Sequence, residues 1–256
     1  MDEHSISLEP AAIARHSVLF TQATCLDPLC SAVNCSRLRS RNSAGLSKPV
    51  MRSSAATVTL STSDLTIDAR RTALMLMDFQ PAILGQVPDW DALMDKAQTA
   101  LGWARAHGVK VVFVRVAFVP DDYDAIPHHH KAFGTVKQNR LLAEGNPSFD
   151  IDPALEVRAG DTVVRKTRFG AFSTTDLHAL FGDESINTLV MGGISTAGVV
   201  LSTVREASDQ DYLIVVLSDA TADSDPEVHR VLIEKVLPGH ADVITTSDLN
   251  HLLRAT

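Results

Sequence analysis

From about residue 62 onward, short apolar runs alternate with stretches in which apolar side chains recur every three or four residues. The apolar runs cover residues 72–79, 109–118, 161–166, 188–194, 212–218 and 241–246. Such runs are typical of buried parallel strands, and the stretches between them are typical of amphipathic helices. The pattern predicts an α/β fold: a three-layer α/β/α sandwich around a six-stranded parallel, Rossmann-like sheet of strand order 3-2-1-4-5-6.

Two of the predicted helices carry clear boundary signals. The stretch Asp91–His107 ends at Gly108, and glycine commonly terminates a helix. A later helix begins at Asp225-Pro226-Glu227, where the aspartate is a good cap and the proline suits the first turn. The side chains expected to be buried along three helices are Leu93, Ala97, Ala100, Leu101 and Ala104; Val200, Val204 and Ala207; and Val228, Val231, Leu232 and Val236.

Residues 119–160 separate the second predicted strand from the third and are too many for a plain connection. The segment contains three adjacent histidines, His128, His129 and His130. Neighbouring side chains of an extended segment point to opposite sides, so these three cannot all face one metal ion. We therefore expect a polar lid or substrate loop, and no metal site.

Residues 1–60 are rich in Ser, Thr, Ala and Arg and lack sustained periodicity. They contain all three cysteines of the chain, Cys25, Cys30 and Cys35, at a spacing that is not a usual zinc pattern. We expect a disordered N-terminal extension without a role in the chemistry, followed by one domain over residues 61–256. A targeting segment, or a working start codon at Met51, remains an alternative for the extension.

The overall charge limits the classes of partner. The formal net charge is −8, so no overall basic surface favours nucleic acid. We find no apolar run of 18 residues and expect no membrane-spanning segment. The cysteine-free domain fits a cytoplasmic protein, and a small acidic substrate would need local cations.

Candidate chemistry lies at the carboxyl ends of the predicted strands, because in such a sheet these ends converge on one crevice. Asp78 ends an apolar run, where a carboxylate is costly to bury unless it is paired, and Lys166 ends the third strand. We expect the two charged groups to lie within ion-pair reach. Asp219 and Asp223, after the fifth strand, are interpreted as a turn residue and part of a helix-entry loop.

A glycine-flanked turn, Gly192-Gly-Ile-Ser-Thr-Ala-Gly198, follows the fourth strand and leads directly into a helix. Position 198, at the helix start, is where a nucleophile would be sought. Gly198 supplies no side chain, and residues 61–256 contain no cysteine.

Three motifs in order resemble the isochorismatase-like hydrolases: Met77-Asp-Phe-Gln80, Val164-Arg-Lys-Thr-Arg-Phe-Gly-Ala-Phe172, and Gly192-Gly-Ile-Ser-Thr196. The resemblance spans roughly residues 65–253. It implies a catalytic triad of Asp, Lys and Cys, with Asp78 and Lys166 as the first two and Gly198 in place of the cysteine. It also implies a cis peptide bond between Ile194 and Ser195, a homo-oligomer (a dimer or a tetramer), and no cofactor.

Without a thiolate, amide hydrolysis by the usual covalent route has no nucleophile. The true isochorismatases of the family are similar to this chain in having glycine there, and they hydrolyse a vinyl ether without a covalent intermediate. By this resemblance Asp78 would donate the proton, Lys166 and Arg168 would hold carboxylates or tune the acid, and amides at the start of the 196–211 helix would bind an oxygen.

The sequence therefore predicts an isochorismatase-like hydrolase of a small anionic or vinyl-ether metabolite. The expected catalytic positions are Asp78, Lys166 and Gly198, and the expected substrate-binding residues are Gln80, Arg168, Phe172, Ile194, Ser195 and Thr196. Two alternatives remain: an amidohydrolase of the nicotinamidase or carbamoylsarcosine type with a substituted nucleophile, and a non-catalytic relative that binds a metabolite.

Overall fold

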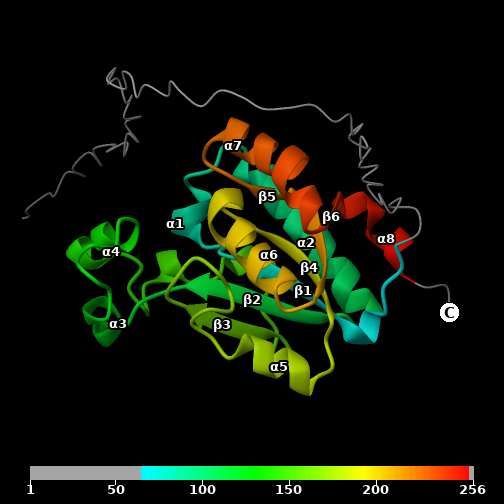
Figure 1. Ribbon diagram of the computed structural model, residues 1–256, viewed down its shortest axis with the longest axis horizontal. Coiled ribbons are helices and arrows are strands. Elements are labelled where there is room, and N and C mark those ends of the chain that lie inside the picture. Colours follow the sequence, from blue (N-terminus) through cyan, green and yellow to red (C-terminus); the bar gives the residue numbers. More distant parts are fainter. Residues whose placement is uncertain (1–64, 254–256) are drawn as a thin grey trace, which may run out of the picture. The chain divides into compact units, whose positions relative to one another are not determined.

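The sheet of this chain is the predicted one. The computed structural model describes residues 65–253, so the whole expected extension, residues 1–60, lies outside the described residues, as do residues 61–64 and 254–256. A six-stranded parallel sheet has the order β3-β2-β1-β4-β5-β6 (Figure 1). Its strands are β1 (Thr72–Met77), β2 (Lys110–Val116), β3 (Thr162–Lys166), β4 (Thr188–Ile194), β5 (Leu213–Ala222) and β6 (Asp242–Ile244).

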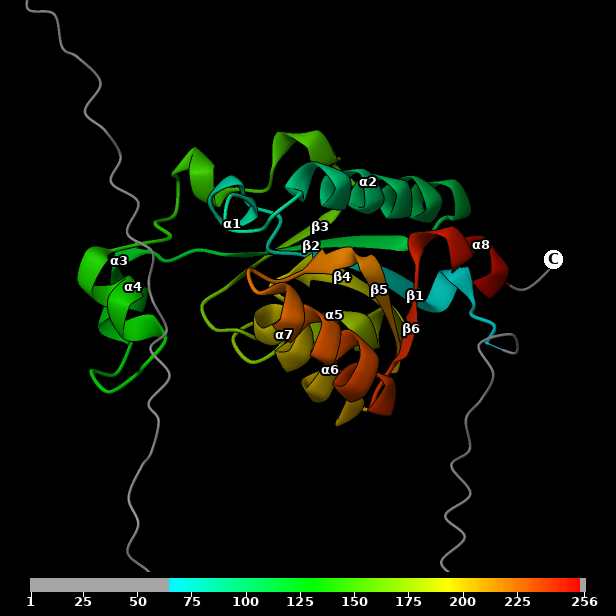
Figure 2. The ribbon, with the colours of Figure 1, turned by 90° about the horizontal axis from the view of Figure 1, so that it is seen from above.

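Helices cover both faces of the sheet, as Figure 2 shows. Helices α1, α2 and α8 pack on one face and α5 and α6 on the other, where each face has its own apolar core. The helices are α1 (Pro81–Leu84), α2 (Trp90–His107), α3 (Pro120–Asp124), α4 (Phe133–Asn139), α5 (Leu177–Asp183), α6 (Leu201–Ser208), α7 (Pro226–Val231) and α8 (Leu249–Leu252). No helix among residues 65–253 combines the length and the apolar character needed to cross a membrane.

Two of the three predicted helix faces are confirmed and one is wrong. The expected faces of α2 and of the helix after β4 are buried throughout. On α7, in contrast, Val228 and Val231 are each 37% exposed. Both valines lie in the regular α-helix; the π-helical turn, Leu232–Val236, begins only after them and changes the spacing to Val236.

Two glycines allow β4 to fit between its neighbours. The register between β4 and β5 shifts at Met191/Gly193, and β5 continues to Ala222, beyond its predicted end. A Cβ atom on Gly192 would lie 2.7 Å from the carbonyl oxygen of Ala220 in β5. One on Gly193 would lie 2.9 Å from the carbonyl oxygen of Met77 in β1, so larger residues would push the strands apart.

The long segment between β2 and β3 is folded and carries α3 and α4. Figures 1 and 2 both place these helices at one end of the described region, beyond the helices that flank the sheet. Arginines on the two strands anchor the segment: Arg115 pairs with Glu144 at 2.6 Å, and Arg165 pairs with Asp122 at 2.5 Å. The segment is thus held at the carboxyl end of the sheet.

Candidate active site

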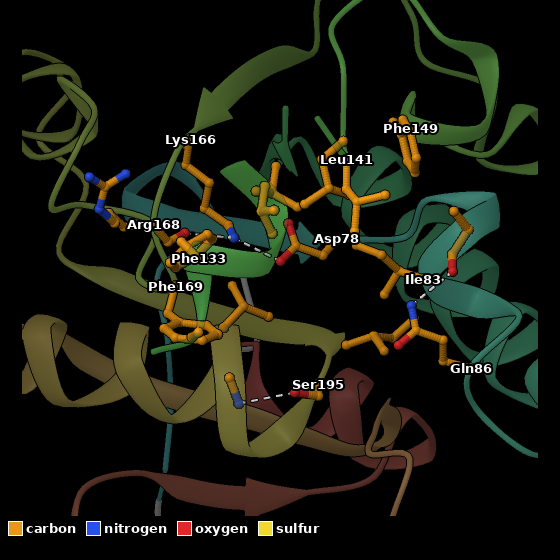
Figure 3. Close-up of a pocket in the computed structure, with 18 of the residues that line it drawn as sticks. Asp78, Ile83, Gln86, Phe133, Leu141, Phe149, Lys166, Arg168, Phe169 and Ser195 are labelled. Atoms are coloured by element: carbon orange, nitrogen blue, oxygen red, sulfur yellow. Dashed lines mark hydrogen bonds and ion pairs between the residues drawn. The ribbon is translucent and has the colours of Figure 1, made fainter. Parts of the chain in front are cut away.

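A cavity of about 500 Å³ lies where β1, β3 and β4 end (Figure 3). The loops after these strands contribute its polar groups, and the β2–β3 segment covers it with apolar side chains. The lining residues include Asp78, Ile83, Gln86, Val87, Val116, Phe133, Val136, Leu141, Leu142, Phe149, Lys166, Arg168, Phe169, Ile194, Ser195, Gly198, Val199 and Ser224. A mostly apolar cavity with a few convergent polar groups is typical of a small-molecule site.

The predicted ion pair at the centre of the cavity is confirmed. Lys166 Nζ donates a hydrogen bond to Asp78 Oδ2 at 2.8 Å. The two residues are only 2% and 5% exposed, respectively. A buried carboxylate and ammonium at this distance stabilise each other's charge, but their desolvation is costly. Stability alone therefore gives little reason for a buried ion pair at this place.

The second carboxylate oxygen of Asp78 has no use within the described part of the chain. Asp78 Oδ1 is buried and has no hydrogen-bond partner among residues 65–253. Burial raises the pKa of Asp78 above its usual value, and the weaker opposing effect of Lys166 lowers it. The backbone holds the residue at the strand end, because the Asp78 N–H donates to the Val114 carbonyl at 2.7 Å. The arrangement suits a carboxyl group that carries a proton in the cavity.

Arg168 adds a second positive group to the cavity wall. Its guanidinium lies 5.6 Å from the centre of the Phe133 ring, and Nη1 donates to the Thr167 carbonyl at 2.6 Å. No carboxylate of the described chain forms a salt bridge with it. Arg168 therefore has donors left for an anionic ligand.

The turn after β4 begins with the expected cis peptide bond between Ile194 and Ser195. The expectation that the first amides of the turn are free to bind a substrate oxygen is wrong for two of them. The Ala197 N–H donates to Asp223 Oδ2 at 2.8 Å, and the Gly198 N–H donates to Ser195 Oγ at 3.1 Å. Any oxygen bound here must use other donors.

Because Gly198 has no side chain, there is room beside it for the Ser195 hydroxyl. A Cβ atom on Gly198 would lie 2.8 Å from Ser195 Oγ and 3.6 Å from Phe169 Cδ1. Val199, the next residue on the turn, is buried and also lines the cavity. Neither position carries a nucleophilic group, and residues 65–253 contain no cysteine.

Three of the predicted substrate-binding residues lie outside the cavity lining. The side-chain amide of Gln80 is hydrogen-bonded to the main chain. Its oxygen accepts from the Val116 N–H at 2.9 Å, and its nitrogen donates to the Val116 carbonyl at 3.0 Å and to the Phe149 carbonyl. Phe172 packs on Phe181 and Tyr212. The hydroxyl of Thr196 is 2.8 Å from His229 Nδ1.

The cavity also contains residues that the sequence did not single out. Most are apolar side chains of the β2–β3 segment, among them Phe133, Val136, Leu141 and Leu142. Their signal was present, since apolar side chains recur in a segment otherwise interpreted as a polar loop. The structure places the expected Arg168, Ile194 and Ser195 in the lining, beside Asp78, Lys166 and Gly198.

The remaining polar candidates have structural partners. Asp219 accepts from the Thr246 N–H at 2.8 Å and from its hydroxyl at 2.7 Å, and Asp223 caps the turn through Ala197. In the β2–β3 segment, His130 Nδ1 accepts from the Phe133 N–H at 3.2 Å. Within residues 65–253, no three His, Cys, Asp or Glu side chains lie close enough to hold a metal ion.

Comparison with known proteins identifies the family. Residues 72–248 match the isochorismatase domain. Ureidoacrylate amidohydrolase RutB from Methylorubrum extorquens is 30% identical over 204 residues, which cover 72% of this chain and 82% of that protein. RutB from Serratia proteamaculans is 31% identical over 179 residues, 62% of this chain and 72% of that protein. The chain belongs to the isochorismatase family of hydrolases, as the sequence predicts.

Solved structures agree on the fold. A cysteine hydrolase from Pseudomonas syringae pv. phaseolicola 1448A superposes with a TM-score of 0.67 at 24% identity, covering 73% of this chain and 94% of that one. An isochorismatase family protein from Burkholderia thailandensis has a TM-score of 0.62 at 27% identity, with coverages of 72% and 95%. N-carbamoylsarcosine amidase from Thermoplasma acidophilum has a TM-score of 0.57 at 22% identity, with coverages of 69% and 96%.

Proposed function

We propose that this hydrolase cleaves a small anionic vinyl ether, with Asp78 as general acid, Lys166 as its electrostatic partner and no cysteine nucleophile. The single observation that carries the proposal is the Asp78 carboxyl group. It is buried in the cavity, its pKa is raised, and Oδ1 has no hydrogen-bond partner in the described part of the chain. An acid with these properties can hold a proton and deliver it to a substrate.

In the proposed reaction the Asp78 carboxyl protonates the terminal carbon of the vinyl group. The ether carbon becomes an oxocarbenium ion, and water adds to it. The resulting hemiketal releases an alcohol and a keto acid, and the proton released from water restores the carboxyl. No step needs a covalent bond to the enzyme. This fits a turn in which Gly198 and Val199 bring no nucleophile to the cavity and the Ser195 hydroxyl accepts a hydrogen bond from the Gly198 N–H.

The two cations have separate tasks in this proposal. Lys166 lies 2.8 Å from Asp78 and stabilises the carboxylate left after proton transfer. Arg168, which has no acidic partner in the described chain, binds the carboxylate of the substrate. The apolar side chains of the β2–β3 segment, such as Phe133 and Leu142, exclude water from the carbon that is protonated.

Amide hydrolysis is the second candidate function, and similarity to ureidoacrylate amidohydrolase RutB favours it. It requires a nucleophile to attack the amide carbonyl, and the domain has no cysteine. A water molecule activated by Asp78 would have to replace the thiol. That role needs the carboxyl group deprotonated, whereas burial favours its protonated form.

An activity panel separates the candidates. The full chain and the variant Asp78→Asn are assayed with isochorismate as the vinyl ether, and with nicotinamide, ureidoacrylate and N-carbamoyl compounds as the amides. Asp95→Asn, which changes an exposed carboxylate on α2, is the matched control. We expect turnover of the vinyl ether, its loss in Asp78→Asn by about a thousandfold or more, and full activity in Asp95→Asn.

Turnover of amides alone would favour the second candidate. Tight binding without turnover of either class would favour a non-catalytic metabolite-binding relative. Full vinyl-ether activity in a folded Asp78→Asn protein would eliminate the general-acid mechanism.

A further inference from the structure

The loop after β3, residues 167–175, forms one wall of the cavity. Two of its side chains, Arg168 and Phe169, line the cavity. The main-chain carbonyl of Arg168 also accepts a hydrogen bond from Lys166 Nζ at 3.1 Å. The position of this loop therefore decides where one acceptor of the buried ammonium group lies, and whatever fixes the loop also fixes the ion pair.

Helix α6 holds the loop through two side chains, Thr203 and Glu206. The Ala171 N–H donates to Thr203 Oγ1 at 3.1 Å, and Thr203 is fully buried. The main-chain amides of Phe172 and Ser173 lie close enough to the Glu206 carboxylate to lower its pKa. Residues 203 and 206 are three apart on the helix and face the same side, so they form one anchor for the loop.

Gly170 brings the loop against this anchor. A Cβ atom on Gly170 would lie 2.5 Å from Glu206 Oε2 and 3.7 Å from Ser202 Cβ. No Lys or Arg of the described region forms a salt bridge with Glu206. Burial raises the pKa of Glu206, and the two loop amides partly oppose this effect. The carboxylate thus has the loop, not a neighbouring cation, as its partner.

We propose that Glu206 and Thr203 are positioning residues for the reaction assigned to Asp78 and Lys166, an inference that rests on the proposed function. They hold residues 171–173 on α6, so that the Arg168 carbonyl stays against the Lys166 ammonium and the loop keeps water from the pair. Neither residue is part of the cavity lining, so both act through the loop.

The state of Asp78 reports on this role. Burial is the largest cause of its raised pKa. If the loop loosens, water reaches the pair, and the pKa of Asp78 falls toward that of an ordinary aspartate. The loss of a remote structural contact that left the loop in place would not change this pKa.

The test is a ¹³C NMR titration of the Asp78 carboxyl group in the full chain, with the signal assigned by its absence in Asp78→Asn. The variants are Glu206→Ala, Glu206→Gln, which keeps one acceptor oxygen, and Thr203→Val, which keeps the shape without the acceptor. Glu227→Ala, which changes an exposed glutamate paired with Arg230 on α7, is the control.

We expect the Asp78 titration midpoint to fall by about one pH unit in Glu206→Ala. It should also fall in Thr203→Val and should fall less in Glu206→Gln. It should not change in Glu227→Ala. With a turned-over substrate, kcat should fall about 10- to 100-fold in Glu206→Ala. An unmoved or raised midpoint in the folded Glu206→Ala and Thr203→Val proteins would overturn the inference. If Glu206→Ala does not fold, Thr203→Val decides.

The titration needs no substrate. A failed activity panel with a lowered midpoint would therefore reject the proposed function and leave the positioning role standing. Normal vinyl-ether activity of the wild-type chain, with an unmoved Asp78 midpoint in the variants, would support the proposed function and reject the positioning role.

Discussion

At the scale of single residues, Asp78 and Lys166 are the pair on which the account depends. Their pairing could be predicted because a carboxylate at the end of an apolar strand needs a cation, and the topology places Lys166 at the same edge of the sheet. The sequence could not show that Gln80 is unavailable to a substrate. Its side-chain amide is hydrogen-bonded to the main chain of Val116, 36 residues away, and no local pattern reveals such a contact.

The charge balance of the pair leads to a prediction about stability. Lys166→Met removes the only group in the described part of the chain that lowers the pKa of Asp78. At neutral pH the folded protein must then bury this group either charged and unpaired or protonated far above its ordinary pKa, so the free energy of unfolding should fall by about 3–5 kcal/mol. The double variant Asp78→Asn/Lys166→Met buries no charge and should regain most of this loss. Urea unfolding at neutral pH measures both. A double variant as unstable as Lys166→Met would show that packing, not charge, causes the loss.

The raised pKa of Asp78 predicts the direction of the pH dependence. A general acid acts in its protonated form, so kcat for the vinyl ether should fall as the pH rises through this pKa. The folded state also holds the proton more tightly than the unfolded state, so the contribution of Asp78 to stability decreases over the same range. The measurement is kcat from about pH 4 to about pH 9. Activity that is lost as the pH falls would instead indicate a base.

At the scale of elements, the turn after β4 limits what a thiol introduced at position 198 can do. Gly198→Cys should not produce an efficient amidase, because its Cβ would lie 2.8 Å from Ser195 Oγ and the hydroxyl must move away. The thiol would also need a lowered pKa and a suitably placed base. Val199→Cys is the matched variant, since Val199 already has a side chain at the cavity wall.

Both variants are assayed with ureidoacrylate and N-carbamoyl compounds, and alkylation by iodoacetamide reports whether each thiol is accessible. Efficient amide turnover by Gly198→Cys would contradict the prediction. Turnover by Val199→Cys alone would favour the second candidate function, with only the thiol missing.

Strands could be predicted more accurately than helix faces. The bounds of β4 are as expected, because a fully buried strand is apolar at every position. The end of β5 was placed too early because Ser218 and Asp219 are polar, yet Asp219 is satisfied by Thr246 within the fold. The α7 face was wrong because the fold leaves the apolar Val228 and Val231 partly exposed, and because regular helical spacing was assumed through the π-helical turn that follows them. Both errors come from long-range or irregular geometry that periodicity does not contain.

At the scale of the whole molecule, the cavity lies between the carboxyl end of the sheet and the β2–β3 segment. The length of residues 119–160 predicted a polar lid or substrate loop, but not that Phe133 and Leu142 would form a cavity wall. Such contacts depend on how a folded segment meets the sheet. The expected homo-oligomer also stays a prediction.

The N-terminal region leads to a further prediction. A chain that begins at Met51 should keep its melting temperature within about 3 °C, which corresponds to less than about 1 kcal/mol, because the periodic pattern starts later. It should keep the vinyl-ether activity as well. The full chain is the control in thermal unfolding and in the assay. Loss of soluble expression or of activity would show that the segment contributes to the domain.

The central claim is that Asp78 delivers a proton to carbon, and hydrolysis of the vinyl ether in D₂O tests it most directly. The methyl group of the keto acid product, analysed by mass spectrometry immediately after turnover, should contain one deuterium per molecule, and Asp78→Asn should form this product about a thousandfold or more slowly. Cleavage of the ether without deuterium in the methyl group, or equal turnover by Asp78→Asn, would contradict it.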